Sequence, residues 1–314
     1  MKDMDEHFHS SKKLPKDTLK KLMQKSDHPA VTRFITMYIL FIATCIWVVH
    51  SWSGYRWQLI LSQLCFGILS CSMFAALHET AHNTAFKSRR LNQLTAWLAG
   101  LAHLYPATVF RELHFTHHRY THVPGLDPEI SLGNKPTPSV IQNLPSYISW
   151  LTGLPLLLFK LFMLFFGAIG MPEIIRNKLY PFIRPEVRLK LAMDSISVLL
   201  FHLGLLLLAL FVNHGFWGLF TGQIAGHCML AGYLTPEHNG LPHEGNVLNR
   251  TRSIRSSILV KFLMWNMPYH AEHHAYPAIP FHALPQLHEE IKEELVHKDD
   301  GHPAFHLKVL QSFF

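Results

Sequence analysis

Histidines recur in three short clusters whose spacing suits metal binding. Along the chain the clusters read H-x-x-x-H, H-x-x-H-H and H-x-x-H-H. Residues three and four apart share one face of a helix, so the imidazoles of each cluster are predicted to reach one metal ion together. Neutral imidazole is the commonest side-chain metal ligand. The eight candidate ligands are His78 and His82, then His114, His117 and His118, then His270, His273 and His274.

The number of imidazoles indicates two metal ions. Eight imidazoles exceed what a single tetrahedral zinc can use. A donor set rich in imidazole and poor in carboxylate suits iron, zinc, copper or nickel, and the spacing does not choose among them. Carboxylates beside the clusters are candidates to orient the imidazoles through the second ring nitrogen. These are Glu79, Glu112, Asp127, Glu237 and Glu272.

Long apolar segments separate the clusters. Charged residues make up 16% of the chain, against about 25% in an average soluble protein. A bilayer is crossed by about 20 apolar helical residues, and four segments without Lys or Arg reach that length. They are residues 34–52, 57–77, 191–212 and 215–234. The sequence therefore predicts an integral membrane protein.

Basic residues set the predicted orientation. The short loops 53–56 and 213–214 hold a single Lys or Arg, which is Arg56. The positive-inside rule then places both termini and all three clusters on the cytoplasmic side. We predict a polar, basic N-terminal arm at 1–30, without a cleaved secretory signal, a membrane domain at 31–290 and a cytosolic tail at 291–314. The net charge of +7 is attributed to contact with lipid head groups, and no nucleic-acid partner is expected.

Two further apolar stretches, residues 91–110 and 150–170, are predicted not to cross. A crossing at 150–170 would put the third cluster on the opposite side from the first two. Pro155 and Lys160 also interrupt that stretch, which is read as a re-entrant or interfacial helix pair. The predicted fold is an all-α membrane protein. Its four transmembrane helices lie under a cytosolic helical cap that holds a two-metal site.

The third cluster carries the most specific motif in the chain. The run W-N-M-P-Y-H-A-E-H-H-A-Y-P at residues 265–277 is similar to the N-x-x-Y-H-x-E-H-H-x-x-P signature of integral-membrane fatty acid desaturases and hydroxylases. Residues 111–129, and the order of the clusters, resemble the same superfamily across about residues 30–290. The resemblance implies two iron ions and four spanning helices beneath a cytosolic cap.

The resemblance also implies a ninth ligand after the last span. The best candidate is His238 in the run E-H-N-G at 237–240, which resembles a Glu-His pair of membrane alkane hydroxylases. Asn239 could instead hold a metal-bound water. His227 and His243 are alternatives to His238.

The implied reaction is an O2-dependent, di-iron oxidation of a long apolar substrate. Desaturation of a fatty acyl chain ranks first, and hydroxylation of a lipid, alkane or carotenoid is the alternative. The expected channel lining includes Phe74, Leu77, Trp97 and Met229. A histidine-rich metal transporter is a different class, disfavoured because the spans pair no acid with a histidine at mid-depth.

Electrons are expected from a separate donor of the ferredoxin, rubredoxin or cytochrome b5 type. The chain has no His-Pro-Gly-Gly haem motif, no iron–sulfur cysteine pattern and no G-x-G-x-x-G fingerprint.

Overall fold

The structure, a computed structural model, describes residues 14–314, so the first part of the predicted N-terminal arm lies outside it. The fold is mostly helical. Its helices are α1 (Lys16–Leu22), α2 (Asp27–Ser51), α3 (Arg56–Ala81), α4 (Arg89–Ala102), α5 (Ala107–Tyr120), α6 (Leu144–Leu151), α7 (Leu154–Ala168), α8 (Glu173–Leu179), α9 (Arg188–Phe211), α10 (Trp217–His238), α11 (Ile258–Leu263), α12 (His270–Ala275), α13 (Leu284–Ile291) and α14 (His302–Gln311).

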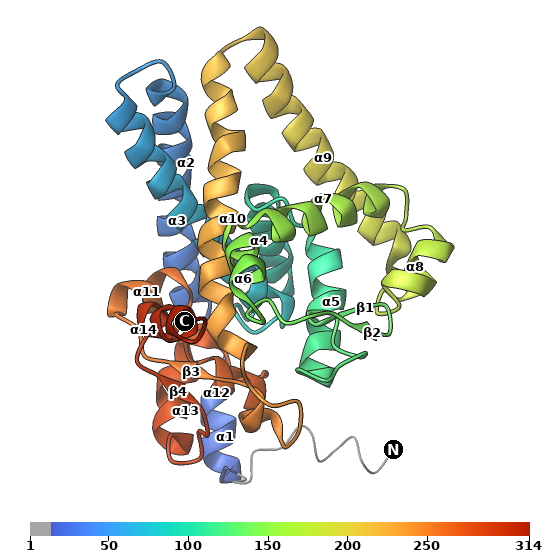
Figure 1. The fold of residues 1–314 in the computed structure, drawn as a ribbon, viewed down its shortest axis with the longest axis vertical. Coiled ribbons are helices and arrows are strands. Elements are labelled where there is room, and N and C mark those ends of the chain that lie inside the picture. The colour runs from blue at the N-terminus through green and yellow to red at the C-terminus, as the bar shows by residue number, and fades with distance from the viewer. Residues whose placement is uncertain (1–13) are drawn as a thin grey trace.

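The long helices form two hairpins, α2–α3 and α9–α10. Both hairpins extend toward the same end of the molecule, and the shorter helices gather at the other end (Figure 1). Helix α3 packs against both α2 and α10, so it lies between them. This arrangement brings the inner ends of α3 and α10, where histidines are located, into the same region.

Three helical segments are long and apolar enough to cross a bilayer: Lys16–Ser51, Arg56–Ala81 and Pro185–Phe211. They contain α2, α3 and α9, which match three predicted spans. Helix α10, predicted as the fourth span, forms over the expected residues but is not in this set. The bent pair α6–α7 would be a fourth span if it crossed.

Close packing against α3 explains why α10 is less apolar. A Cβ added at Gly222 would lie 2.5 Å from Cδ1 of Phe66, and one at Gly226 would lie 2.7 Å from Oγ of Ser70. Small residues at four-residue spacing let two membrane helices approach closely. Much of the α10 surface therefore contacts protein, where glycine and polar residues fit better than long aliphatic side chains.

The stretch 150–170 is a bent helix pair, as the sequence predicts. Helices α6 and α7 meet at an angle of 58°. The break falls at Gly153, where φ is +69° and an added Cβ would collide with the backbone of His227. Pro155 lies in the first turn of α7, directly after the break, where a proline is well tolerated. Lys160 does not interrupt α7, and its side chain is buried.

The stretch 91–110 also bends back, because α4 ends at Ala102 and α5 begins at Ala107. Helix α4 packs on α3, and α5 contacts both. The returning chain places the second histidine cluster beside the first.

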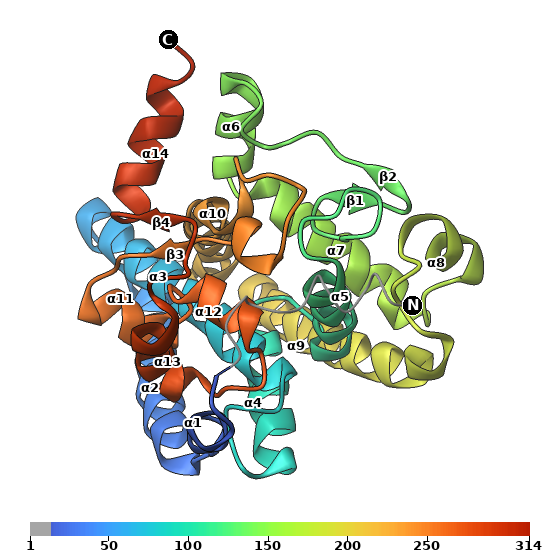
Figure 2. The ribbon, with the colours of Figure 1, turned by 90° about the horizontal axis from the view of Figure 1, so that it is seen from below.

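Short elements join the C-terminal part to the rest. Seen from below, α12 lies close to the inner ends of α3 and α10 (Figure 2). Strand β3 (Ser253–Ile254) pairs in parallel with β4 (Lys298–Asp299), and β1 (Ser131–Leu132) pairs antiparallel with β2 (Lys135–Pro136). The predicted boundary at residue 290 falls in the last turn of α13, and β4 follows it. The tail therefore packs on the same cap as α12.

Candidate metal centre

Four helices bring the candidate ligands together. His78 lies in the last turn of α3, and His82 caps that helix. Helix α5 carries the second cluster, and the short α12 carries the third. His238 is the last residue of α10. Asn266 of the signature run helps to fix α12, because its side-chain amide donates to the carbonyl of Phe281 at 2.9 Å.

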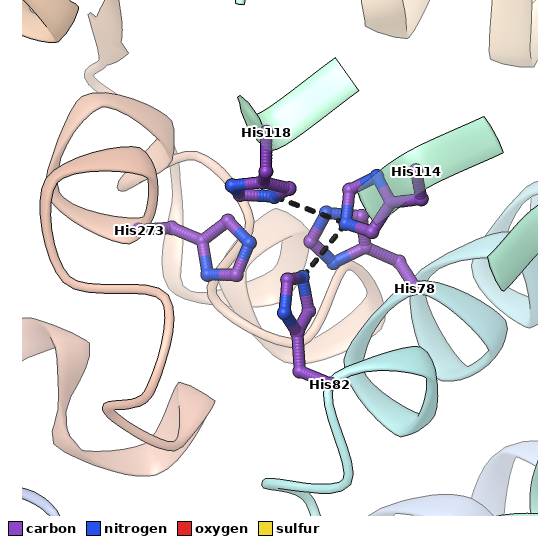
Figure 3. A group of neighbouring side chains, drawn as sticks. All are labelled: His78, His82, His114, His118 and His273. Atoms are coloured by element: carbon purple, nitrogen blue, oxygen red, sulfur yellow. Dashed lines mark hydrogen bonds between the residues drawn. The ribbon is translucent and has the colours of Figure 1, made fainter. Parts of the chain in front are cut away.

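Five imidazoles form the first group. One ring nitrogen from each lies within 4.8 Å of the others. Nε2 of His114 is central, at 2.7 Å from Nε2 of His82 and 3.1 Å from Nε2 of His118. The rings converge from α3, α5 and α12 (Figure 3). The members of this first group are His78, His82, His114, His118 and His273.

Four imidazoles form the second group, again with one nitrogen each within 4.8 Å of the others: His117, His238, His270 and His274. Nε2 of His270 lies 2.8 Å from Nε2 of His238. Nε2 of His117 lies 3.3 Å from that of His274. The two groups are adjacent, since the rings of His118 and His274 stack with centroids 4.1 Å apart.

The sequence clusters do not correspond one to one with these groups. We expected each cluster to reach one metal ion, and this was wrong for two of them. On α5, His117 turns to the second group while its neighbour His118 turns to the first. On α12, His273 joins the first group while His270 and His274 join the second. Neighbouring residues on a helix lie about 100° apart, so His117 and His118, or His273 and His274, can face different groups that lie side by side.

Three of the predicted carboxylates face ring nitrogens of these histidines. Asp127 accepts from Nδ1 of His117 at 2.9 Å. Glu79 lies 3.2 Å from Nδ1 of His78, and Glu237 lies 3.6 Å from Nδ1 of His270. The hydrogen bonds of Asp127 and Glu79 fix the tautomer and orientation of their imidazoles and leave Nε2 for a metal, whereas Glu237 at 3.6 Å forms no hydrogen bond with His270.

The other three predicted partners face elsewhere. Glu112 forms two hydrogen bonds with the guanidinium of Arg184, both at 2.8 Å. Glu272 accepts from Ser253 and contacts His288. The Asn239 side-chain amide donates to the carbonyl of Thr235. Each of these residues is close in sequence to a histidine cluster or to His238, but its side chain faces away from the nine grouped imidazoles.

The alternatives to His238 lie outside both groups. His227 contacts Lys160, and Nδ1 of His243 donates to the carbonyl of His122. The sequence did not reveal two further contacts. Glu129 lies 3.6 Å from Nδ1 of His117, and the carbonyl of Arg250 accepts from Nδ1 of His238 at 2.9 Å. Glu129 follows Asp127 by two residues, a signal that could have identified it.

Electrostatics differ between the groups. Burial, with the charge of His78, lowers the pKa of His273 to about 3. Burial alone would also lower the pKa of His117, but Asp127 and Glu129 raise it to about 9. His273 is therefore neutral at physiological pH, as a metal ligand must be. A metal ion would have to displace a proton from His117.

Buried nitrogens without hydrogen-bond partners fit a metal-binding role for the groups. Within residues 14–314, Nε2 of His78 and both ring nitrogens of His273 are buried and form no hydrogen bond. Buried polar atoms are rarely left unpaired, so each such atom calls for an explanation. Imidazole sets of this kind fit a transition metal by donor type.

The family model for fatty acid desaturase matches residues 55–305, most of the chain. The chain belongs to the fatty acid desaturase family. A mouse (Mus musculus) sphingolipid delta(4)-desaturase/C4-monooxygenase is 27% identical over 303 residues, which is 94% of this chain and 83% of that protein. A rice (Oryza sativa subsp. japonica) sphingolipid delta(4)-desaturase DES1-like protein is 26% identical over 254 residues, 78% of this chain and 68% of that protein.

Family membership and the apolar helices together identify a desaturase-like oxidoreductase that is integral to the membrane. This desaturase has a cavity of about 450 Å³ between α3, α4, α5 and α9, which is lined by apolar and charged side chains and by none of the nine grouped histidines. Two of the side chains predicted to line a substrate channel, Leu77 and Trp97, line it. Phe74 and Met229 do not.

Proposed function

We propose that this protein uses two iron ions, one in each histidine group, to oxidise a long lipid chain with O2, and that desaturation is the main outcome. The observation that carries the proposal is the pair of adjacent imidazole groups, built in part from the family signature at residues 265–277. The proposed ligands are the nine histidines of the two groups. Iron bound there would supply the O2 activation that attack on an unactivated C–H bond requires.

The protein's own residues supply orientation and a dry site. Asp127 holds the Nδ1 proton of His117, so Nε2 of that ring is directed into the second group. Glu79 acts in the same way on His78 in the first group. All nine histidines except His82 are buried, which limits access of bulk water. The cavity lined by Leu77 and Trp97 is the proposed approach for the lipid.

Sphingolipids are the first substrate class to test, because the relatives at 26–27% identity carry that class in their names. Hydroxylation is the second candidate outcome. The mouse relative is named as both a desaturase and a C4-monooxygenase, so one scaffold of this kind supports both activities. The separate electron donor, of the ferredoxin, rubredoxin or cytochrome b5 type, is part of the proposal.

The decisive experiment is product analysis with purified protein, a reduced donor system and 18O2. Sphingolipid and fatty acyl substrates are supplied to the wild type, to His273→Ala and to the control His214→Ala, which changes an exposed histidine outside both groups. Unlabelled products that have lost two hydrogens support desaturation, whereas a labelled alcohol supports hydroxylation. Exchangeable zinc in place of iron, with no oxidised lipid, would instead favour the transporter hypothesis.

Four spans with a cytoplasmic cap form the proposed topology, with α10 as the fourth span. Single cysteines at the exposed positions Lys178 and Ala278, in a cysteine-free background, should react with an impermeant reagent only from the cytoplasmic side. A cysteine at Ser53 should react only from the other side. Labelling of positions 178 and 278 from opposite sides would contradict this topology.

A further inference from the structure

Lys160 of α7 is buried without a countercharge. Its side chain is only 1% exposed. Within residues 14–314, the ion pairs of lysine and arginine side chains do not include one for Lys160. Lysine is almost never fully buried unless it is paired, and ionisable groups within membrane segments usually mark functional sites.

A small polar cluster, here called the Lys160 cluster, surrounds this side chain. It consists of Lys160, His227, His103, Ser70 and Gln223. Nζ of Lys160 lies 3.2 Å from Nε2 of His227, whose Nδ1 donates to the carbonyl of Gln223 at 2.7 Å. The ring of His103 stacks on that of His227, with centroids 4.9 Å apart. Nδ1 of His103 lies 3.3 Å from Oγ of Ser70.

The cluster has hydrogen-bonding capacity that the protein does not use. The amino group of Lys160 carries at least two N–H donors, and among the described residues its one hydrogen-bond partner is His227. Its other neighbours include the faces of Tyr105 and Phe74, with ring centroids 5.0 and 5.9 Å from Nζ. Within the described residues, Nε2 of His103 and Oε1 of Gln223 are buried and have no partner. Leaving such groups unpaired in a buried site destabilises the protein, so a bound partner is expected for them.

The Lys160 cluster lies next to the first histidine group. The ring centroid of Phe74 is 6.4 Å from that of His78 and 5.9 Å from Nζ of Lys160. The ammonium is therefore no more than about 12 Å from the His78 ring. A single lipid can span this distance, with a polar group at the cluster and its chain beside the histidines.

We propose that the Lys160 cluster binds an oxygen-bearing polar group of the lipid substrate, such as a carboxylate, amide carbonyl or hydroxyl. This inference rests on the proposed function for its substrate. The polar group, once bound, sets which carbon of the chain faces the histidine groups. Lys160 is thus a specificity-determining binding residue.

The N–H donors of the cluster decide the class of ligand. Nζ of Lys160 carries N–H donors in either protonation state, and an acceptor oxygen pairs with them, whereas an alkylammonium group offers only donors. A purely apolar chain would leave the N–H groups of Lys160 unpaired. A hydroxyl or an amide accepts from Lys160 and can also donate to the unpaired Oε1 of Gln223, whereas a carboxylate can only accept.

The first test measures binding to the iron-loaded protein without O2 or reductant, so that no turnover occurs. Radiolabelled octadecyl lipids carry a carboxylate, an amide, a hydroxyl or an ammonium group, and a plain octadecane serves as reference. The oxygen-bearing lipids should bind at least about tenfold more tightly than the other two. Equal binding of the ammonium lipid or of octadecane would overturn the proposal. A preference for the carboxylate over the amide and hydroxyl lipids would identify an anionic group as the natural ligand. A preference for the amide or hydroxyl lipid would identify a neutral group.

The second test uses Lys160→Met, with Lys178→Met on the exposed face of α8 as the matched control. Lys160→Met should abolish the preference for oxygen-bearing lipids, raise KM and broaden the position of oxidation, with iron content unchanged. Lys178→Met should behave as wild type.

An unchanged preference and an unchanged product position in Lys160→Met would refute the inference, even if the enzyme oxidises lipids normally. If Lys160→Met does not fold, the lipid series on wild-type protein still decides the question. A wild type that oxidises no lipid would count against the proposed function and not against the binding preference.

Discussion

Two buried polar regions lie side by side in this desaturase, and they differ in the groups that accompany their imidazoles. The histidine groups combine imidazoles with the carboxylates Asp127, Glu79 and Glu237. The Lys160 cluster combines imidazoles with a lysine amino group and has no carboxylate in ion-pair distance among the described residues. Burial of charge is tolerated only when it is compensated. The first region is therefore suited to a metal cation, and the second to an acceptor oxygen.

The two regions share two helices. Helix α3 carries Ser70 for the Lys160 cluster and His78 for the histidines, and α10 carries His227 and His238. Each pair of residues lies along one helix, so the helices set the distance between the regions. A lipid bound across both would be aligned by the α3–α10 contact.

The largest expected effect separates the two histidine groups. His114→Ala removes the central ligand of the first group, and His274→Ala removes one from the second. Each variant should lose the iron of its own group, and turnover should fall by more than about 100-fold, because ligand loss exceeds the effect of losing an outer partner. Iron per chain is measured by mass spectrometry, with His214→Ala as the control. Full iron retention in both variants would show that the groups are not ligands.

A smaller effect is expected from the carboxylate that orients His117. Asp127→Asn keeps an acceptor oxygen but removes the charge, so iron affinity of the second group should fall about 10–100-fold. Affinity is measured by competition with a chelator. Glu112→Gln is the matched control, because Glu112 pairs with Arg184 and not with a histidine. A loss of iron in Glu112→Gln as large as in Asp127→Asn would contradict the assignment.

Gly222→Ala tests whether the shared helix contact supports both regions. The added Cβ meets Phe66, and overpacking costs about 1–3 kcal/mol, more than the roughly 0.5–1 kcal/mol that Ala gains over Gly in a helix. Thermal unfolding in detergent should begin at a lower temperature, and lipid binding and iron content should fall together. Gly204→Ala, where the added Cβ meets nothing within 4 Å, should not lower stability. If only lipid binding or only iron content fell, the α3–α10 contact would not be the common support of the two regions.

A pH dependence is expected from the second group and not from the first. The pKa of His117, about 9, means that its ring is protonated at neutral pH without metal. Metal must displace one proton, so affinity should rise by about tenfold per pH unit as pH increases toward 9. The pKa of His273 is about 3, so this residue of the first group is already neutral and adds no pH dependence to the metal affinity. Chelator competition from neutral to mildly alkaline pH measures both, and Asp127→Asn should flatten the slope.

Local sequence was sufficient for some features. The histidine spacings, the helices α2, α3, α9 and α10, and the bend in residues 150–170 all follow from periodicity, hydropathy and charge. The signature at 265–277 was sufficient to indicate the family, which the family model confirms. These features depend on neighbours within a few turns, where the geometry of the helix fixes which side chains share a face.

Tertiary packing decided the rest. His117 and His118 are adjacent in sequence yet belong to different groups, because ligands from other helices and from the α12 segment surround each ring differently. Glu112 had the same sequence signal as Asp127, but Arg184 takes its carboxylate. In the sequence, Lys160 was interpreted as a break in an apolar stretch. In the structure, α3, α7, α10 and the end of α4 meet around it, so Lys160 lies buried at the centre of a polar cluster. Spacing determines what one helix can present, whereas the partners come from segments far away in sequence, and no local pattern encodes them.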